Sequence, residues 1–144
     1  MKRYLLVLGV LLCYSSVFSQ ISIVNFHYKV SNCSYLDSSA FYKINSVEYP
    51  KYTSGDFVFV EDLRTLMTSK KFKKKDEGTY TAVINKDWDN IIVSSTSEKV
   101  SDKKLFLIAK MMRESKPNWR PLIANKKIIT DFTFTISFEV WVED

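Results

Sequence analysis

The chain has 144 residues, which is the length of a single domain. Its formal net charge is +5, but Lys2 and Arg3 belong to an N-terminal segment that we predict to be removed, and no acid goes with them, so the net charge falls to +3. A surplus this small on an exported chain argues against nucleic acid as a partner.

Residues 1–19 have the layout of a secretory signal peptide. A positively charged start leads into an apolar run from Tyr4 to Val17, and Ser19 supplies a small residue at the end. The run is shorter than the roughly 20 apolar residues of a spanning helix. We therefore predict a cleaved signal and an exported protein. The alternative is that the segment stays uncleaved and anchors the chain in a membrane.

Few residues with catalytic or metal-binding chemistry remain after residue 19. Cys33 is then the single cysteine, so no internal disulfide can form; we expect a buried, inert thiol, with pairing between two molecules as the alternative. His27 is the only histidine, and we expect it to be packed or at the surface. One His and one Cys cannot assemble a zinc site, and no Gly-rich phosphate loop is present. We expect no catalytic, cofactor-binding or metal-binding residues, no small-molecule substrate and no enzymatic activity.

The first predicted elements of the remaining chain are a strand and a helix. Residues 21–30 alternate, and the even positions form the better apolar face. That face carries Val24, Phe26, Tyr28 and Val30. Farther on, apolar residues at helical spacing predict a helix at about residues 56–69, with Ser54 as its candidate cap.

A hairpin and a second helix follow. Residues 80–84 and 91–95 predict two strands around the turn "NKDWDN", because Asn and Asp favour turns. We expect Trp88, in this turn, to fold back on the sheet; a contact site is the alternative. The segment "VSDKKLFLIAKMMRES" predicts a helix that is capped by Ser101 or Asp102 and covered on two sides.

The chain ends on a long alternating run. One face belongs to the core and the other to water. We expect the core face to carry Ile128, Thr130, Phe132, Phe134, Ile136, Phe138, Val140 and Val142. The opposite face carries Asp131, Thr133, Thr135, Ser137 and Glu139, with Trp141 as an apolar exception. Ordinary strands have about 3–10 residues, so either the start of the run is a loop or part of it overhangs the sheet.

The order of these elements resembles the C-terminal domain of TonB-type energy transducers, in the form common among Bacteroidetes. "NSVEYPKYTSGDFVFVEDLRTLM" is similar to the Glu-Phe-Pro-Gly-Gly start and first helix of that family. "GTYTAVINKDWDNIIVSSTSEKVSD" resembles its hairpin, and "PNWRPLIANKKIITDFTFTISFEV" resembles its Trp-Lys-Pro segment and final strand. The sequence departs from the family pattern at the turns, and the transmembrane anchor and Pro-rich spacer of a full transducer are not found in it.

The resemblance implies an α+β fold, an antiparallel sheet with two helices packed on one face, to which this chain adds an N-terminal strand. The implied domains are the signal peptide (1–19), an N-terminal strand and loop extension (20–46) and a TonB C-terminal-like domain (47–144). It also implies a periplasmic location, with an uncleaved inner-membrane anchor as the alternative. Trp119 is expected to be a core anchor that covers a helix end.

In the family, this domain binds a short peptide of an outer-membrane TonB-dependent transporter by pairing it with the final strand, which is strand addition. The resemblance thus implies a non-catalytic binding domain whose docking edge is residues 130–137. The expected partner-binding residues are Thr130, Asp131, Thr133, Thr135 and Ser137. The alternatives are that these residues form the outer face of an ordinary sheet, and that the protein is a structural or self-associating module, for instance a homodimer, with no transport role.

Overall fold

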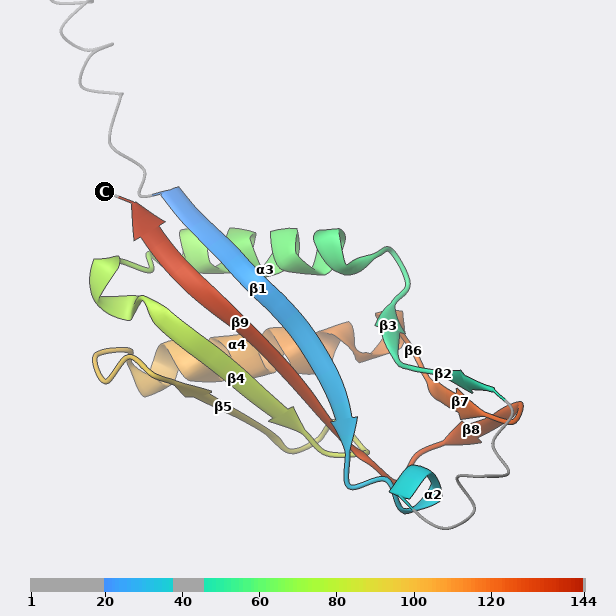
Figure 1. Ribbon diagram of the computed structural model, residues 1–144. Coiled ribbons are helices and arrows are strands. Elements are labelled where there is room, and N and C mark those ends of the chain that lie inside the picture. Colours follow the sequence, from blue (N-terminus) through green and yellow to red (C-terminus); the bar gives the residue numbers. More distant parts are fainter. Residues whose placement is uncertain (1–19, 38–45, 144) are drawn as a thin grey trace, which may run out of the picture.

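The main body of the protein is a four-stranded antiparallel sheet with two helices on one face (Figure 1). The computed structural model describes residues 20–37 and 46–143, so the predicted signal peptide lies outside the described residues. In their order across the sheet, the strands are β1 (Gln20–Ser31), β9 (Thr133–Glu143), β4 (Gly78–Ile84) and β5 (Ile91–Ser95). This arrangement confirms the predicted α+β class with an N-terminal strand in addition.

The two long helices lie behind the sheet in Figure 1, and the short strands gather at one end of it. The helices are α3 (Asp56–Ser69) and α4 (Asp102–Ser115). The short elements are α2 (Ser34–Asp37), β2 (Val47–Glu48), β3 (Lys51–Tyr52), η2 (Lys74–Asp76), η3 (Lys116–Asn118), β6 (Trp119–Arg120), β7 (Leu122–Ala124) and β8 (Lys127–Ile129). The short strands form two small sheets, β2-β7-β8 and β3-β6.

The core lies between the sheet and the helices. Helix α3 contributes Phe59, Leu63 and Met67, and α4 contributes Ile108, Ala109 and Met112. They face the buried side chains of β4 and β9, which are Tyr80, Ala82, Ile84, Phe134, Ile136, Phe138, Val140 and Val142. Because each large apolar side chain stabilises the fold by about 1.5–3 kcal/mol when buried, this layer explains why the alternation of β9 is so regular.

Trp119 occupies the centre of an aromatic cluster at the end of α4. It is 8% exposed, and its Nε1 donates a hydrogen bond to Ser115 Oγ at 3.1 Å. Its ring centroid lies 5.1–6.2 Å from those of Phe59, Phe134, Tyr52, Tyr28 and Trp88. The predictions that Trp119 anchors the core and that Trp88 folds back on the sheet are both confirmed.

The bounds of α3 and α4 agree with the prediction, and so does one of the two predicted helix caps. Ser101 caps α4, because its Oγ accepts a hydrogen bond from the Lys104 N–H. The proposed cap of α3 was wrong: Gly55, at φ 96°, precedes the helix, and no side chain caps it. An L-residue rarely adopts that backbone conformation, whereas glycine does so readily.

The terminal run is divided into two strands. The short strand β8 ends at Ile129, and residues 130–132 link it to β9. The start of the run is therefore a loop, and the prediction that Ile128 faces the core was wrong, since Ile128 is 65% exposed. From Thr133 onward the alternation follows the predicted faces, and Trp141 is exposed on the outer one.

Candidate functional site

The residues predicted to bind a partner lie in two settings. Thr130 and Asp131 are exposed in the link before β9. Thr133, Thr135 and Ser137 lie in β9, with partly exposed side chains on the face of the sheet that the helices leave uncovered.

The edge that these residues were expected to offer is already occupied. On one side, residues 133–137 of β9 pair with residues 27–31 of β1; on the other side, residues 134–137 pair with residues 81–84 of β4. An inner strand has no unpaired row of N–H and C=O groups to give to a guest. The prediction of a docking edge at residues 130–137 was therefore wrong, and the reason is β1, which takes the place beside the final strand.

Side chains close the part of β9 that extends past β4. The last register pair between these strands joins Gly78 to Val140. Beyond it, the Val142 N–H donates to Glu77 Oε1 at 2.8 Å, and Lys74 Nζ donates to the Val142 carbonyl at 3.3 Å. The hydrogen bond from Lys74, and then that from Val142, lower the pKa of Glu77 below its usual value. The overhang thus has its main-chain groups satisfied without a partner strand.

The longest open edge is the outer side of β1. The Val142 N–H points toward the β4 side of β9, because Glu77 accepts its hydrogen bond there. Along a strand, the main-chain N–H and C=O groups of successive residues point to opposite sides. Two residues that lie opposite each other in an antiparallel pair exchange either both of their hydrogen bonds or neither. The β1 residues opposite the even positions of β9 must therefore direct their main-chain groups outward. They are Ile21, Ile23, Tyr28 and Val30, and no described strand pairs with that side.

A bulge divides this edge in its middle. The register of β1 against β9 shifts between Val24 and His27, and Asn25 has φ 53°. Its Nδ2 donates to Glu139 Oε1 at 3.0 Å, which fixes the irregularity to the neighbouring strand. The extra residue also changes which positions face the core. Before the bulge Ile21 is buried and Val24 is exposed, so the prediction of one even apolar face was wrong for the first half of the strand.

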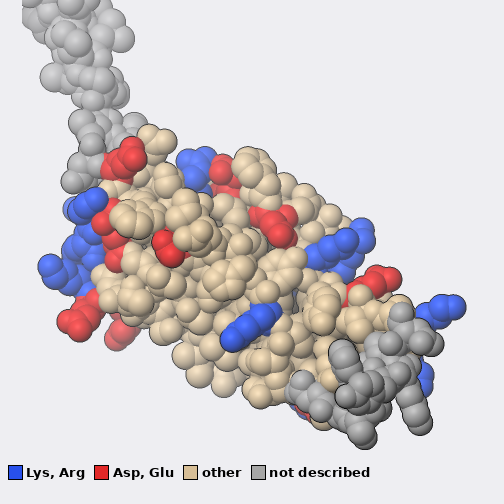
Figure 2. All heavy atoms as spheres, viewed as in Figure 1, with Lys and Arg blue, Asp and Glu red and all other residues tan. Residues whose placement is uncertain are grey.

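The sheet offers a second, shorter edge and an open face. Strand β5, with five residues, forms the other margin. The face turned to the viewer in Figure 1 is largely uncharged in Figure 2, with most charged groups near its rim. An edge with unpaired main-chain groups is able to bind an extended chain.

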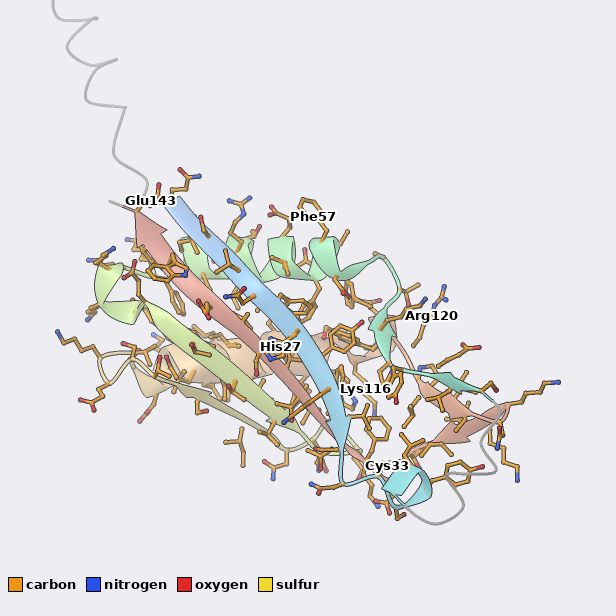
Figure 3. The ribbon with its side chains drawn as sticks, viewed as in Figure 1. His27, Cys33, Phe57, Lys116, Arg120 and Glu143 are labelled. Carbon is orange, nitrogen blue, oxygen red and sulfur yellow. The ribbon has the colours of Figure 1, made fainter. Side chains whose placement is uncertain are left out.

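The described residues show no constellation for metal binding. No group of three or more His, Cys, Asp and Glu side chains lies close enough to hold an ion. His27 is exposed on β1, with its Nδ1 2.9 Å from the Asn25 carbonyl oxygen (Figure 3). Cys33 is 1% exposed, as expected for a buried thiol. Each helix in the described part of the chain is too short or too polar to cross a membrane.

Comparison with known proteins identified no relative. No family model matches the chain, and searches of curated proteins and of solved structures returned no match.

Proposed function

We propose that the protein is a non-catalytic binding domain of the periplasm that takes up an extended segment of a partner protein by strand addition at the outer edge of β1. One observation carries this proposal: a strand of 12 residues forms the margin of the main sheet, and its outward main-chain groups have no partner strand. Such an edge supplies affinity through backbone hydrogen bonds, and the alternate side chains supply selectivity.

The resemblance to the TonB C-terminal domain supports a particular partner, the periplasmic end of an outer-membrane TonB-dependent transporter. In that family the guest pairs with the final strand. Here β1 lies beside β9, so the place of the guest moves outward by one strand.

A guest that displaced β1 would have to expose much of the core. Phe26 packs on Phe59 with ring centroids 5.6 Å apart, and Tyr28 packs on Trp119 and Phe134 at 5.6 and 5.5 Å. Exposing each such side chain costs about 1.5–3 kcal/mol. A guest strand that adds outside β1 leaves these side chains buried, which favours binding at the outer edge.

The test compares two substitutions at Val30. Val30→Pro removes an outward N–H, whereas the matched control Val30→Ala keeps that N–H and loses at least as much of the side chain. We expect synthetic peptides from the periplasmic ends of transporters to bind Val30→Ala about tenfold more tightly than Val30→Pro, which corresponds to one hydrogen bond of about 1.5 kcal/mol. Fluorescence anisotropy measures the affinities, and thermal unfolding verifies that both variants are folded. Equal affinities would refute strand addition at this edge.

The same edge supports a second candidate, self-association without a role in transport. An antiparallel strand can pair with a copy of itself, and β1 presents its outer edge in every molecule. Sedimentation of the purified protein separates the two candidates. A tight dimer that ignores transporter peptides and dissociates in Val30→Pro supports self-association, and a monomer at every concentration contradicts it.

A further inference from the structure

Two adjoining pockets lie among the short strands, and the larger of them also borders the second half of β1. The larger, of about 360 Å³, is lined by Tyr28, Glu48, Tyr49, Pro50, Lys51, Arg120, Pro121 and Ile123. The smaller has about 170 Å³. It shares Pro50, Arg120 and Pro121 with the larger, so these three residues separate the two pockets. Ligand pockets in proteins have volumes from about 300 Å³ upward, so the larger pocket is in this range by itself.

The walls of the double pocket are basic. Four of the lining residues are cations, namely Lys51, Lys86, Lys116 and Arg120, and one is an acid, Glu48. Among the described residues, no carboxylate lies within ion-pair distance of any of the four cations. Figure 3 shows Lys116 and Arg120 on the side of β1 where the short strands lie.

Two aspartates lie near Lys116, and each interacts with it without forming an ion pair. Lys116 Nζ donates to the main-chain carbonyl of Asp87 at 3.1 Å. The carboxylate of Asp89 accepts a hydrogen bond from Asn85 Nδ2 at 2.7 Å. That bond, and to a smaller degree the charge of Lys116, lower the pKa of Asp89. Asp131 is exposed and does not line either pocket. The charge of Asp89 therefore offsets part of that of Lys116, whereas Arg120 has no carboxylate within ion-pair distance among the described residues.

The wall of the smaller pocket is aromatic. Its lining includes Trp88, Trp119, Phe132 and Phe134. Trp88 is held at φ 62°, where a bulky residue is strained. Its ring lies 6.0 Å from that of Phe134 and keeps an apolar surface beside the cations. A ligand that fits both features has an apolar side chain next to a negative charge.

We infer that the double pocket binds one acidic and one apolar residue that lie two positions apart in an extended peptide, and therefore on the same face of it, with Arg120 receiving the carboxylate. The inference rests on the proposed function in taking the ligand to be an extended peptide. Tyr28 connects the two, because it lines the larger pocket and also directs its main-chain groups to the open edge. A strand added outside the second half of β1 places the side chains of one face at the larger pocket, which adjoins the smaller one.

The experiment uses labelled nonapeptides of alternating threonine and valine in which positions 4 and 6, which lie on one face, are Phe and Glu, Phe and Gln, or Ala and Glu. These are the Phe–Glu, Phe–Gln and Ala–Glu peptides. We expect the Phe–Glu peptide to bind about three- to fivefold more tightly than the Phe–Gln peptide, as for one exposed ion pair. It should also bind more tightly than the Ala–Glu peptide, which has no ring to bury in the aromatic pocket. Arg120→Gln should weaken binding of the Phe–Glu peptide about three- to fivefold and leave the affinity for the Phe–Gln peptide unchanged. Lys103→Gln, which removes an exposed cation of α4 away from both pockets, is the matched control and should change neither.

Each result separates the inference from the proposed function. Equal binding of the Glu and Gln peptides, or equal effects of Arg120→Gln and Lys103→Gln, overturns the pocket inference and leaves strand addition standing. A charge-dependent affinity that is the same in Val30→Pro and Val30→Ala supports the pocket and refutes strand addition. Failure of every peptide to bind overturns both. Arg120 is exposed, so thermal unfolding should show Arg120→Gln as stable as the unsubstituted protein.

Discussion

The ion pair between Asp76 and Lys104 joins the turn before β4 to helix α4, and its two partners are expected to respond unequally to substitution. Asp76 is fully buried. Its Oδ2 accepts hydrogen bonds from Lys104 Nζ and from the Lys73 N–H at 2.9 Å, whereas Oδ1 has no hydrogen-bond partner among the described residues. The side chain of Lys104 is 17% exposed and lies over the ring of Phe72 at 4.8 Å.

The magnitudes follow from what each substitution leaves behind. Lys104→Met retains the methylene packing but leaves a buried carboxylate with one N–H donor, and removing one partner of a buried pair costs about 3–5 kcal/mol. Asp76→Asn retains an acceptor for the Lys73 N–H, and the flexible Lys104 side chain can turn to water. That substitution should cost only about 1–2 kcal/mol. The double variant should be more stable than Lys104→Met alone, because it holds no unpaired charge.

Urea unfolding followed by circular dichroism measures these free energies, and calorimetry gives the melting temperatures. For a domain of this size, a loss of about 3 kcal/mol should lower Tm by about 10 °C. The reasoning is refuted if Lys104→Met is no less stable than Asp76→Asn, or if the double variant is the least stable of the three.

Three further predictions concern single positions. Gly78→Ala should cost about 2 kcal/mol in chemical unfolding, because a Cβ there would lie 2.7 Å from Thr96 Oγ1 and φ is 152°; Gly55→Ala, with no atom within 4 Å, should cost only about 1 kcal/mol of backbone strain. Ser101→Ala should lower the free energy of unfolding by about 1 kcal/mol through loss of the α4 cap, and Ser101→Asp should retain that stability. Burial raises the pKa of Tyr80 from 10.0 to about 12, so ultraviolet titration should find that this phenol loses its proton at a higher pH than an exposed tyrosine. Because the folded pKa lies above the unfolded one, stability from Tyr80 is complete below pH 10 and is lost as the pH rises to about 12; constant stability over that range would contradict this assignment.

The helices and the hairpin could be predicted from the sequence because their signals are local. Helix α3 occupies residues 56–69 as its spacing predicts, and Ser101 begins α4 where a cap is expected. The burial of Trp119 follows from its place between a helix end and a strand. The cap at Ser54 failed for an equally local reason, since the backbone turns at Gly55 through a conformation that a spacing pattern does not reveal.

The candidate site could not be predicted because it depends on which strands are neighbours. The alternation of apolar and polar residues shows which face of a strand is buried, but it does not show which other strand pairs with that strand. Asn25 and Glu139, which bond across the pair, are separated by 114 positions in the chain. A single added residue at the bulge then reversed the faces of the first half of β1. The prediction placed Thr133, Thr135 and Ser137 on the correct face of their strand. It took that strand to be an edge strand, whereas in the structure it is an inner strand.

The structure also narrows where a guest strand could bind, because most exposed main-chain groups of the sheet are protected. Proteins defend such edges with bulges, charged side chains and short strands. The overhang of β9 is closed by Glu77 and Lys74, β5 has only five residues, and the first half of β1 ends at the bulge around Asn25. Residues 27–31 of β1 carry one such defence, the exposed Lys29, and the basic, aromatic double pocket adjoins this stretch through Tyr28. Since an open edge promotes aggregation unless something selects its guest, the coincidence of that stretch with a pocket of defined charge argues for one binding site made of both.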